Sequence, residues 1–93
     1  MKNYIKPYEK EYSIYIISNC KYCKLIKENI KSKKKIINCD KYVETLRERD
    51  NFYNFIQKYT KIPYKYFPMI FKNGEFIGGY KEFLDFNLKT NHQ

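Results

Sequence analysis

The sequence lacks any apolar run close to the roughly 20 residues that span a membrane, and no basic segment followed by an apolar one opens it. It contains no internal repeat, low-complexity segment or linker, and its 93 residues are the size of one small domain. Hydrophobic residues still make up 43% of the chain, which is enough for a folded core. We therefore expect a single globular domain in the cytoplasm, with no membrane partner.

Acidic residues are scarce, since ten Asp and Glu stand against 19 Lys and Arg, a formal net charge of +9. Residues 1–36 hold most of the excess, with ten lysines against three glutamates, a net of +7. A basic field favours anionic ligands such as nucleic acids, phosphates or carboxylate-bearing peptides, without choosing among them. No nucleic-acid-binding motif is present, and AT-rich codon bias also explains part of the lysine content. We therefore expect no specific nucleic-acid partner.

Only three cysteines are present, too few and an odd number for the disulfide framework of a small secreted protein. A Cys-x-x-Cys pair with one further cysteine points instead to intracellular redox or metal chemistry. A zinc site would need Cys20, Cys23, Cys39 and His92 as ligands. Zinc ligands usually come as two compact pairs, however, and Cys39 and His92 each stand alone. We expect no metal site, and we expect Cys39 to be a spare, half-buried thiol.

Hydrophobic periodicity predicts an α/β domain with the element order β-α-β-α-β-β-α. The strands are expected at residues 12–17, 36–37, 67–71 and 75–77, and the helices at 22–30, 41–60 and 80–88. Asp50 and Asn51 favour helix caps and could break the second helix. Asn73-Gly74 predicts a tight hairpin between the last two strands. Residues 1–11 are polar and charged, which predicts a mobile or loosely docked arm before a single domain at residues 12–93.

The clearest chemical signal is the segment Cys20-Lys21-Tyr22-Cys23, which follows the first strand and opens the first helix. Unpaired backbone N–H groups and the helix dipole favour an anion there, and the ammonium groups of Lys21 and Lys24 add to this preference. Cys20 is therefore expected to carry a reactive thiolate. Cys23 shares the inward stripe of the helix and is expected to be the recessed, resolving thiol. Such a pair is the minimum needed for thiol–disulfide exchange.

Three motifs occur in order along residues 12–90. Cys20-Lys21-Tyr22-Cys23 is followed by Tyr-Phe-Pro-Met-Ile-Phe at residues 66–71 and by Asn-Gly-Glu-Phe-Ile-Gly-Gly at residues 73–79. Together they resemble the Cys-Pro-Tyr-Cys motif, the Thr-Val-Pro-x-Val-Phe strand and the Ile-Gly-Gly hairpin of the glutaredoxin family. The resemblance implies a thioredoxin-like fold, in which helices flank a four-stranded mixed sheet.

The resemblance also implies a glutathione-binding groove beside the cysteines. Its residues would come from the first helix, the proline loop and the start of the last helix, namely Tyr22, Lys65, Phe67, Pro68, Gly79, Tyr80 and Lys81. Pro68 would follow a cis peptide bond, and the backbone of Phe67 would pair with the cysteinyl unit of glutathione. The start of the last helix would receive the γ-glutamyl carboxylate, and Lys65 would bind the glycine carboxylate.

The chain departs from the family's pattern at four positions. Lys21 replaces a proline, and in part of the family a non-proline residue there accompanies iron–sulfur cluster binding, although we expect no cluster here. Ile17 stands in place of a common lysine and Tyr64 in place of a common glutamine. Lys81 stands where an aspartate is common.

The motifs predict a dithiol glutaredoxin, an enzyme that uses glutathione as co-substrate and reduces disulfide-bonded or glutathionylated proteins. Cys20 would be the nucleophile and Cys23 the resolving thiol. One alternative is a component of a protein disulfide relay that works without glutathione. Another is a non-enzymatic module that binds zinc, an iron–sulfur cluster or nucleic acid.

Overall fold

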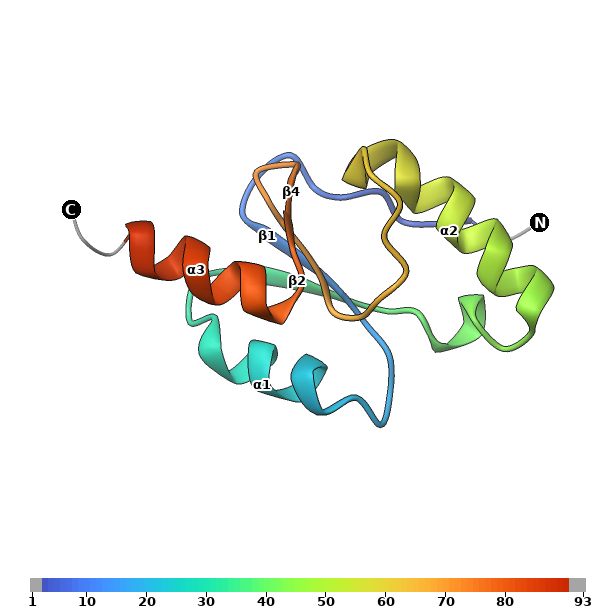
Figure 1. Cartoon of the computed structure of the whole chain (residues 1–93), viewed down its shortest axis with the longest axis horizontal. Coiled ribbons are helices and arrows are strands. Elements are labelled where there is room, and N and C mark those ends of the chain that lie inside the picture. The colour runs from blue at the N-terminus through green and yellow to red at the C-terminus, as the bar shows by residue number, and fades with distance from the viewer. Residues whose placement is uncertain (1–2, 91–93) are drawn as a thin grey trace.

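Four strands form one mixed sheet, with three α-helices packed around it. In the computed structural model, which describes residues 3–90, the elements are β1 (Tyr12–Ile16), α1 (Lys21–Asn29), β2 (Lys34–Asn38), the 3-10 helix η1 (Asp40–Tyr42), α2 (Leu46–Thr60), β3 (Met69–Lys72), β4 (Glu75–Gly78) and α3 (Tyr80–Thr90). The strand order is β2-β1-β3-β4, with β1 parallel to β2 and the other neighbours antiparallel (Figure 1). The predicted order of elements and the mixed sheet are therefore confirmed. None of the described helices is long and apolar enough to cross a membrane.

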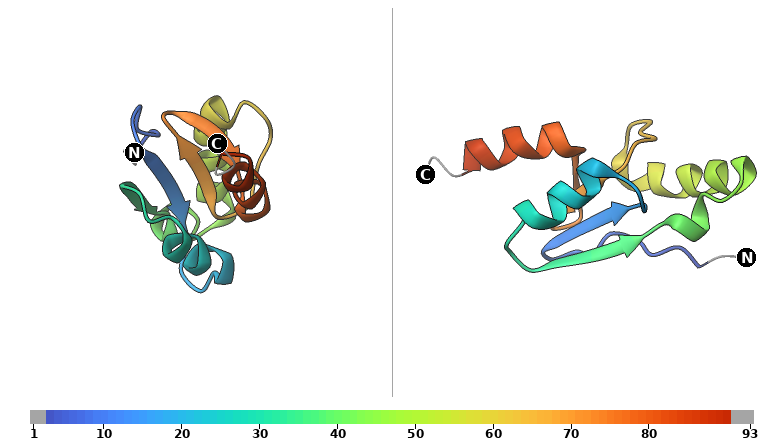
Figure 2. Two further views of the ribbon diagram at one scale, coloured as in Figure 1. Left: turned by 90° about the vertical axis from the view of Figure 1, so that its left-hand side faces the viewer. Right: turned by 90° about the horizontal axis from the view of Figure 1, so that it is seen from below.

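The side chains of β1 alternate between the two faces of the sheet, because successive residues of a strand point in opposite directions. On one face lies a largely aliphatic core, made of Tyr12, Ile14, Ile16, Cys23, Ile26, Ile30, Ile70 and Phe83. On the other lies an aromatic-rich core, made of Tyr15, Ile37, Cys39, Phe52, Tyr53, Ile56, Met69 and Phe71. The aliphatic core is covered by α1 and α3, which lie side by side, and the aromatic core by α2 (Figure 2).

Helix α2 begins later than predicted and is continuous. The expected helix over residues 41–60 is instead a short 3-10 turn followed by a separate helix from Leu46. Thr45 sets the start, because its hydroxyl oxygen accepts a hydrogen bond from the Glu48 N–H at 3.1 Å, as in a capping box. The predicted break at residues 50–51 is wrong, since both side chains are exposed and leave the helical backbone intact. Lys61 ends the helix in the left-handed conformation, with φ of 66°.

Two strands start at other residues than predicted. β2 spans five residues instead of two, because it pairs in parallel with the whole of β1, from Tyr12 opposite Lys34 to Ile16 opposite Asn38. β3 starts at Met69, after the proline, which has no N–H to donate to a strand ladder.

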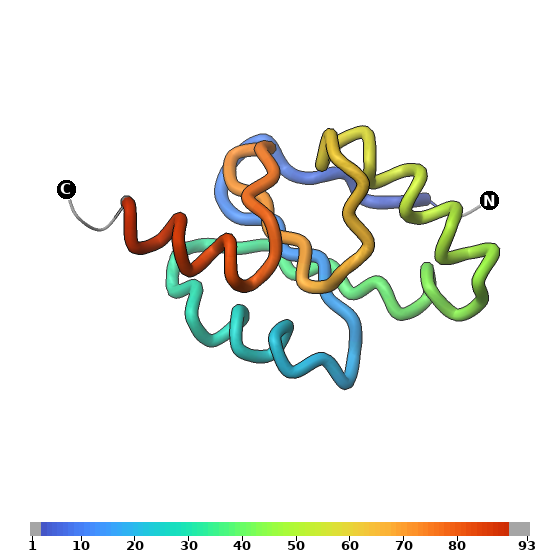
Figure 3. The backbone as a smooth tube through the Cα atoms, viewed as in Figure 1, coloured from blue at the N-terminus to red at the C-terminus, as the bar shows by residue number. Residues whose placement is uncertain are grey.

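Residues 3–11, part of the segment expected to be a mobile or loosely docked arm, are packed against the domain. The ring of Tyr4 contacts Phe52 and Phe55 of α2, with ring centroids 5.8 and 4.9 Å apart. Pro7 is buried, and the Tyr15 hydroxyl donates a hydrogen bond to the carbonyl of Ile5. Figure 3 shows this segment running from α2 towards the β3–β4 hairpin. The segment is polar overall, so its composition did not indicate that a few apolar side chains pack it against the domain.

Candidate active site

Cys20 occupies the N-cap of α1. Asn19, in the left-handed conformation with φ of 57°, turns the chain from the loop after β1 into the helix. The backbone of Cys20 is extended, and its carbonyl accepts the first helical hydrogen bond, from the Lys24 N–H at 3.1 Å. Its sulfur accepts a hydrogen bond from the Cys23 N–H, also at 3.1 Å. A sulfur at this point faces the positive end of the helix, where a thiolate is stabilised.

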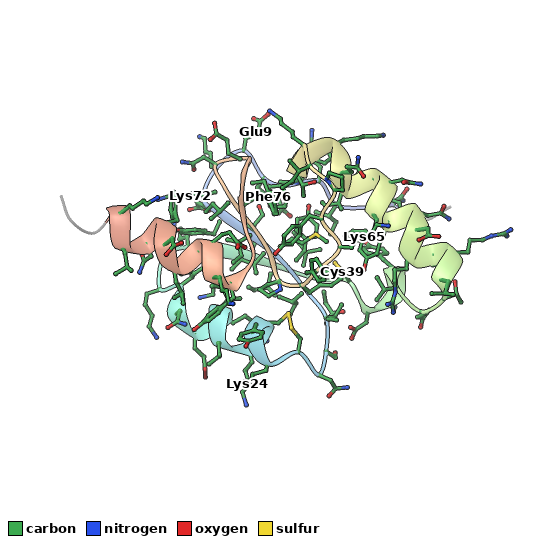
Figure 4. The ribbon with its side chains drawn as sticks, in the orientation of Figure 1. Glu9, Lys24, Cys39, Lys65, Lys72 and Phe76 are labelled. Carbon is green, nitrogen blue, oxygen red and sulfur yellow. A yellow bond between two sulfur atoms is a disulfide. The ribbon has the colours of Figure 1, made fainter. Side chains whose placement is uncertain are left out.

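Cys20 and Cys23 form a disulfide, with their Cα atoms 5.2 Å apart, and it is drawn as a yellow bond beside α1 in Figure 4. The two sulfurs differ in access. Cys20 is partly exposed, whereas only 2% of Cys23 is exposed, because it packs in the aliphatic core with Ile26 and Ile30. The predicted recession of Cys23 is therefore confirmed, and an incoming group can reach only Cys20.

The proline loop lies against the cysteines. The Phe67–Pro68 peptide bond is cis, as the resemblance implied, and Pro68 is buried. The Cys20 sulfur lies 3.8 Å from the carbonyl oxygen of Phe67, 47 residues further along the chain. The Phe67 ring stacks on Phe52, with centroids 6.1 Å apart, so the aromatic core holds this loop in place. The first two motifs thus form one site.

The start of α3 joins the same site through a pair of tyrosines. The rings of Tyr22 and Tyr80 have centroids 5.3 Å apart, and the Tyr80 hydroxyl accepts a hydrogen bond from the Asn29 side-chain amide at 3.3 Å. Tyr22 remains 49% exposed, so its ring is available to a ligand. Tyr80, which directly follows the third motif, therefore lies beside Tyr22 of the first motif.

No protein-family model matches the sequence, and no curated protein matches it at the sequence level. Solved structures do match. The holo form of glutaredoxin C1 from Populus tremula x tremuloides superposes with a TM-score of 0.63 at 16% identity, over 86% of this chain and 76% of that one. The dithiolic glutaredoxin 2-C-Grx1 of Trypanosoma brucei brucei gives 0.67 at 20% identity, over 87% and 80%. Glutaredoxin 1 of Francisella tularensis, complexed with cacodylate, gives 0.61 at 25% identity, over 89% and 98%.

The chain has the glutaredoxin fold. This confirms the resemblance and the thioredoxin-like architecture that it implied. With the cysteine pair at the start of α1, this glutaredoxin fold supports a thiol–disulfide oxidoreductase.

In this glutaredoxin fold the N-terminus of α3 is partly covered by the chain's own side chains. The Gly79 N–H donates a hydrogen bond to the Glu82 carboxylate at 2.8 Å. The Tyr64 hydroxyl lies against Gly79, in the space that a side chain at that position would fill. Burial raises the pKa of Tyr64, and the charge of Glu82 raises it further. The Gly79 N–H is thus bonded to Glu82 in this structure, and the binding of a carboxylate at Gly79, Tyr80 and Lys81 stays a prediction.

Lys65 lies beside α2. Its ammonium nitrogen is 5.8 Å from the centroid of the Tyr53 ring, and its carbonyl accepts a hydrogen bond from the Tyr53 hydroxyl at 3.4 Å (Figure 4). The side chain is exposed and can swing on its flexible stem. Its role in binding a carboxylate stays a prediction.

Asp40 supports the cysteine loop, and the sequence analysis missed it. Its carboxylate accepts hydrogen bonds from both the backbone N–H and the hydroxyl of Ser18, two residues before Cys20. These bonds hold the pKa of Asp40 below its ordinary value, the hydroxyl contributing most. Asp40 therefore ties the loop after β1 to the end of β2. The available signal was its place just after a strand parallel to β1, because the ends of parallel strands meet at one edge of the sheet.

Cys39 is fully buried, which corrects the expectation of a half-buried thiol. It lies in the aromatic core, on the other face of the sheet from Cys23. Burial, with a smaller contribution from Asp40, raises the pKa of Cys39 to about 12. Within residues 3–90 no three His, Cys, Asp or Glu side chains are grouped to hold a metal ion. His92, the fourth ligand of the zinc alternative, lies outside the described residues.

Proposed function

We propose that the protein is a glutathione-dependent thiol–disulfide oxidoreductase of the cytoplasm that reduces protein–glutathione mixed disulfides and protein disulfides. The observation that carries the proposal is the position of Cys20 at the N-cap of α1, beside the carbonyl of Phe67, with Cys23 buried behind it. A helix N-terminus lowers the free energy of a thiolate, and the thiolate is the attacking species in disulfide exchange.

With a glutathionylated protein, the Cys20 thiolate attacks the glutathione sulfur. A Cys20–glutathione disulfide forms, and the protein leaves as a thiolate that takes up a proton. A second glutathione thiolate then attacks the bound glutathione sulfur, which yields oxidised glutathione and frees Cys20. The start of α1 stabilises the Cys20 thiolate both as nucleophile and as leaving group.

With a protein disulfide, Cys20 attacks one target sulfur and the other leaves as a thiolate. Cys23 then attacks the Cys20 sulfur, which closes the Cys20–Cys23 disulfide and releases the second target thiolate. Two glutathione molecules reduce the disulfide in turn and become one oxidised glutathione. Cys23 is fast in this step because it is held next to Cys20 at high effective concentration.

Glutathione would lie on the α3 side of Cys20. The backbone of Phe67 at the cis-proline loop would pair with its cysteinyl unit, and Tyr22 and Tyr80 would flank the chain of the tripeptide. The free N–H groups of Tyr80 and Lys81 would take the γ-glutamyl carboxylate, and Lys65 the glycine carboxylate. Pro68 presents no N–H that would compete with these contacts.

The test is glutathione-linked reduction of a small glutathione mixed disulfide, followed with glutathione reductase and NADPH. We expect turnover that requires Cys20, and equilibration against glutathione buffers should give a reduction potential of roughly −200 to −230 mV. No turnover, with a potential near −120 mV, would contradict the proposal. An absorbance spectrum and metal analysis of the purified protein test the zinc and iron–sulfur alternatives.

One observation favours a second candidate, a disulfide relay component that works without glutathione. Glu82 and Tyr64 already cover the start of α3, where the γ-glutamyl carboxylate would lie. If this covering weakens glutathione binding, Tyr64→Gln should lower the KM for glutathione several-fold, with Tyr8→Gln as the control on a remote exposed tyrosine. An unchanged KM would show that Tyr64 does not limit access.

A further inference from the structure

A groove lies beside the disulfide, and neither Phe67 nor Pro68 of the cis-proline loop lines it. Both cysteines line it, together with the loop of residues 17–19, Asn38 at the end of β2, and Lys21, Lys24 and Lys27 of α1. We call this surface the lysine groove. None of the seven residues predicted to bind glutathione lines it. Cys20 therefore has two flanks, and only one of them is accounted for by glutathione.

The lysine groove carries charge of one sign. Its three lysines follow one another at intervals of three residues along α1, so they occupy neighbouring positions on the helix surface. All three are exposed, and Lys24 extends away from the sheet in Figure 4. No acidic residue lines the groove, and the first turn of α1 contains none. An ordinary solvated helix face mixes charges of both signs, whereas the α1 residues that line this groove carry only positive charge. Asp40 does not line the groove, although its carboxylate accepts hydrogen bonds from Ser18, which does.

The occupant has to present a sulfur to Cys20. Only the Cys20 side of the disulfide is accessible, so a target bonded to it must lie across one of the two flanks. Peptide chains carry disulfides and nucleic acids do not, which favours a polypeptide over a nucleic acid in the lysine groove. Carboxylates beside the target cysteine would meet the ammonium groups of Lys24 and Lys27.

We propose that the lysine groove binds the segment that flanks the target's disulfide, and that it selects protein substrates with Asp or Glu next to the reacting cysteine. The proposal rests on the proposed oxidoreductase function and names its substrate class. The reaction is unchanged: the Cys20 thiolate displaces one target sulfur, and Cys23 releases the other. The groove raises the rate of the first step by concentrating acidic segments at Cys20.

The test uses pre-reduced protein and three peptides of one sequence, each closed by one disulfide and flanked by Glu, Gln or Lys. The rate constant for a single turnover is measured without glutathione, so glutathione affinity does not enter. We expect the Glu peptide to react about tenfold faster than the Gln peptide at low salt, and the Lys peptide more slowly than either. The preference should shrink as the salt concentration rises, because the lysines are exposed.

Charge-reversal variants locate the effect. Lys27→Glu should bring the ratio of the Glu rate to the Gln rate below one, whereas Lys58→Glu, the same charge change on an exposed position of α2, should leave the ratio as it was. The ratio is the readout, because a change in the reactivity of Cys20 would alter both rates together and leave it unmoved.

A Gln peptide that is reduced as fast as the Glu peptide would overturn the lysine groove as a selector while the oxidoreductase function stands. Equal loss of preference in both variants would also overturn it, since net charge would then be the cause. The groove would be assigned to nucleic acid instead if the protein showed no peptide preference but bound a single-stranded oligonucleotide, and if Lys27→Glu abolished that binding. Failure to reduce any of the three peptides would refute the oxidoreductase function itself, and the selection with it.

Discussion

Cys20 and Cys39 follow neighbouring parallel strands, and the Cys39 N–H even donates a hydrogen bond to the carbonyl of Ile16 at the end of β1. Their surroundings are nevertheless opposite. Cys20 lies at the N-cap of a helix, open on one side and next to a groove of lysines. Cys39 lies without exposure in the aromatic core, where burial raises its pKa to about 12. Two thiols at the same edge of one sheet are thus made reactive or inert by what covers them.

The two cores also differ in the part of the site that each one positions. The aliphatic core sits under α1 and α3 and carries the disulfide at its rim. The aromatic core is larger in side-chain volume, with Phe52 in ring contact with residues as far apart as Tyr4 and Phe67. It therefore fixes the cis-proline loop from behind, while the aliphatic core fixes the start of α1. The site forms where elements anchored by the two different cores meet.

The largest expected effect is on catalysis. Cys20→Ser should abolish reduction of both glutathione mixed disulfides and protein disulfides, whereas Cys39→Ser should retain most of both activities. Cys23→Ser should keep most deglutathionylation and lose most protein-disulfide reduction, because only the latter needs the neighbouring thiol. Rates on both substrates are measured for the three variants.

An active Cys20→Ser protein would mean that another group is the nucleophile. Equal loss of the two activities in Cys23→Ser would refute the glutathione-first mechanism and favour an obligatory dithiol cycle.

A second prediction compares the thiols directly. In the reduced, folded protein at pH 8, iodoacetamide should modify Cys39 at least about a thousandfold more slowly than Cys20, because the thiolate of Cys39 is almost unpopulated and buried. Mass spectrometry of each site gives the rates, and denaturant provides the control by restoring ordinary reactivity to Cys39. Comparable rates in the folded protein would contradict the distinction between the two sites.

The raised pKa of Cys39 also gives a pH dependence of stability. The pKa of Cys39 is higher in the folded protein than in the unfolded chain, so the unfolded chain loses this proton first as the pH rises. The stability that the neutral thiol allows is therefore fully present below a pH of about 8.5 and is lost as the pH rises towards about 12. The free energy of unfolding of the wild type should therefore fall more steeply over this range than that of Cys39→Ala, as measured by denaturation at each pH.

The fourth prediction separates the cores by stability. Phe52→Ala should lower the free energy of unfolding by about 4 kcal/mol, and Ile26→Ala by about 3 kcal/mol, because the larger side chain leaves the larger cavity. Urea denaturation gives both values, and Phe52→Leu is the milder variant should the first not fold. Phe52→Leu should also reduce activity, since the Phe67 ring loses its stacking partner. A greater loss from Ile26→Ala would reverse the ranking of the two cores.

The smallest expected effect concerns the link between Ser18, in the loop before Cys20, and Asp40, which follows Cys39. Ser18→Ala removes the hydroxyl that donates to Asp40, so the pKa of Asp40 should rise towards its ordinary value, as seen by NMR titration of the carboxyl group. The interaction with Ser18 is present above the ordinary carboxyl pKa and is lost as the pH falls through the lowered one. Activity should fall by no more than about threefold, because the bond from the backbone N–H of Ser18 remains. Ser32→Ala, the same change at an exposed position in the loop before β2, should leave this titration unaltered.

The sequence by itself determined the features that depend on neighbours along the chain. The buried strand β1, the apolar stripe that buries Cys23 and the Asn73-Gly74 hairpin follow from apolar content, local periodicity and turn chemistry, so they could be predicted without a structure. The cis peptide bond before Pro68 was implied only by the family resemblance. The pattern that starts α2, Thr45 with Glu48 three residues later, is also local to the sequence.

Only the tertiary structure decided the features made by residues far apart in the chain. Glu82 and Tyr64 at the start of α3, Asp40 beneath the cysteine loop, and Tyr4 in the aromatic core each depend on which strands are neighbours and which helix covers which face. No local pattern contains that information, because a side chain's burial and hydrogen-bond partners are set by packing across the sheet. The lysine groove is of the same kind: the charges are visible in the sequence, but their placement beside Cys20, in a groove that neither Phe67 nor Pro68 lines, is a property of the fold.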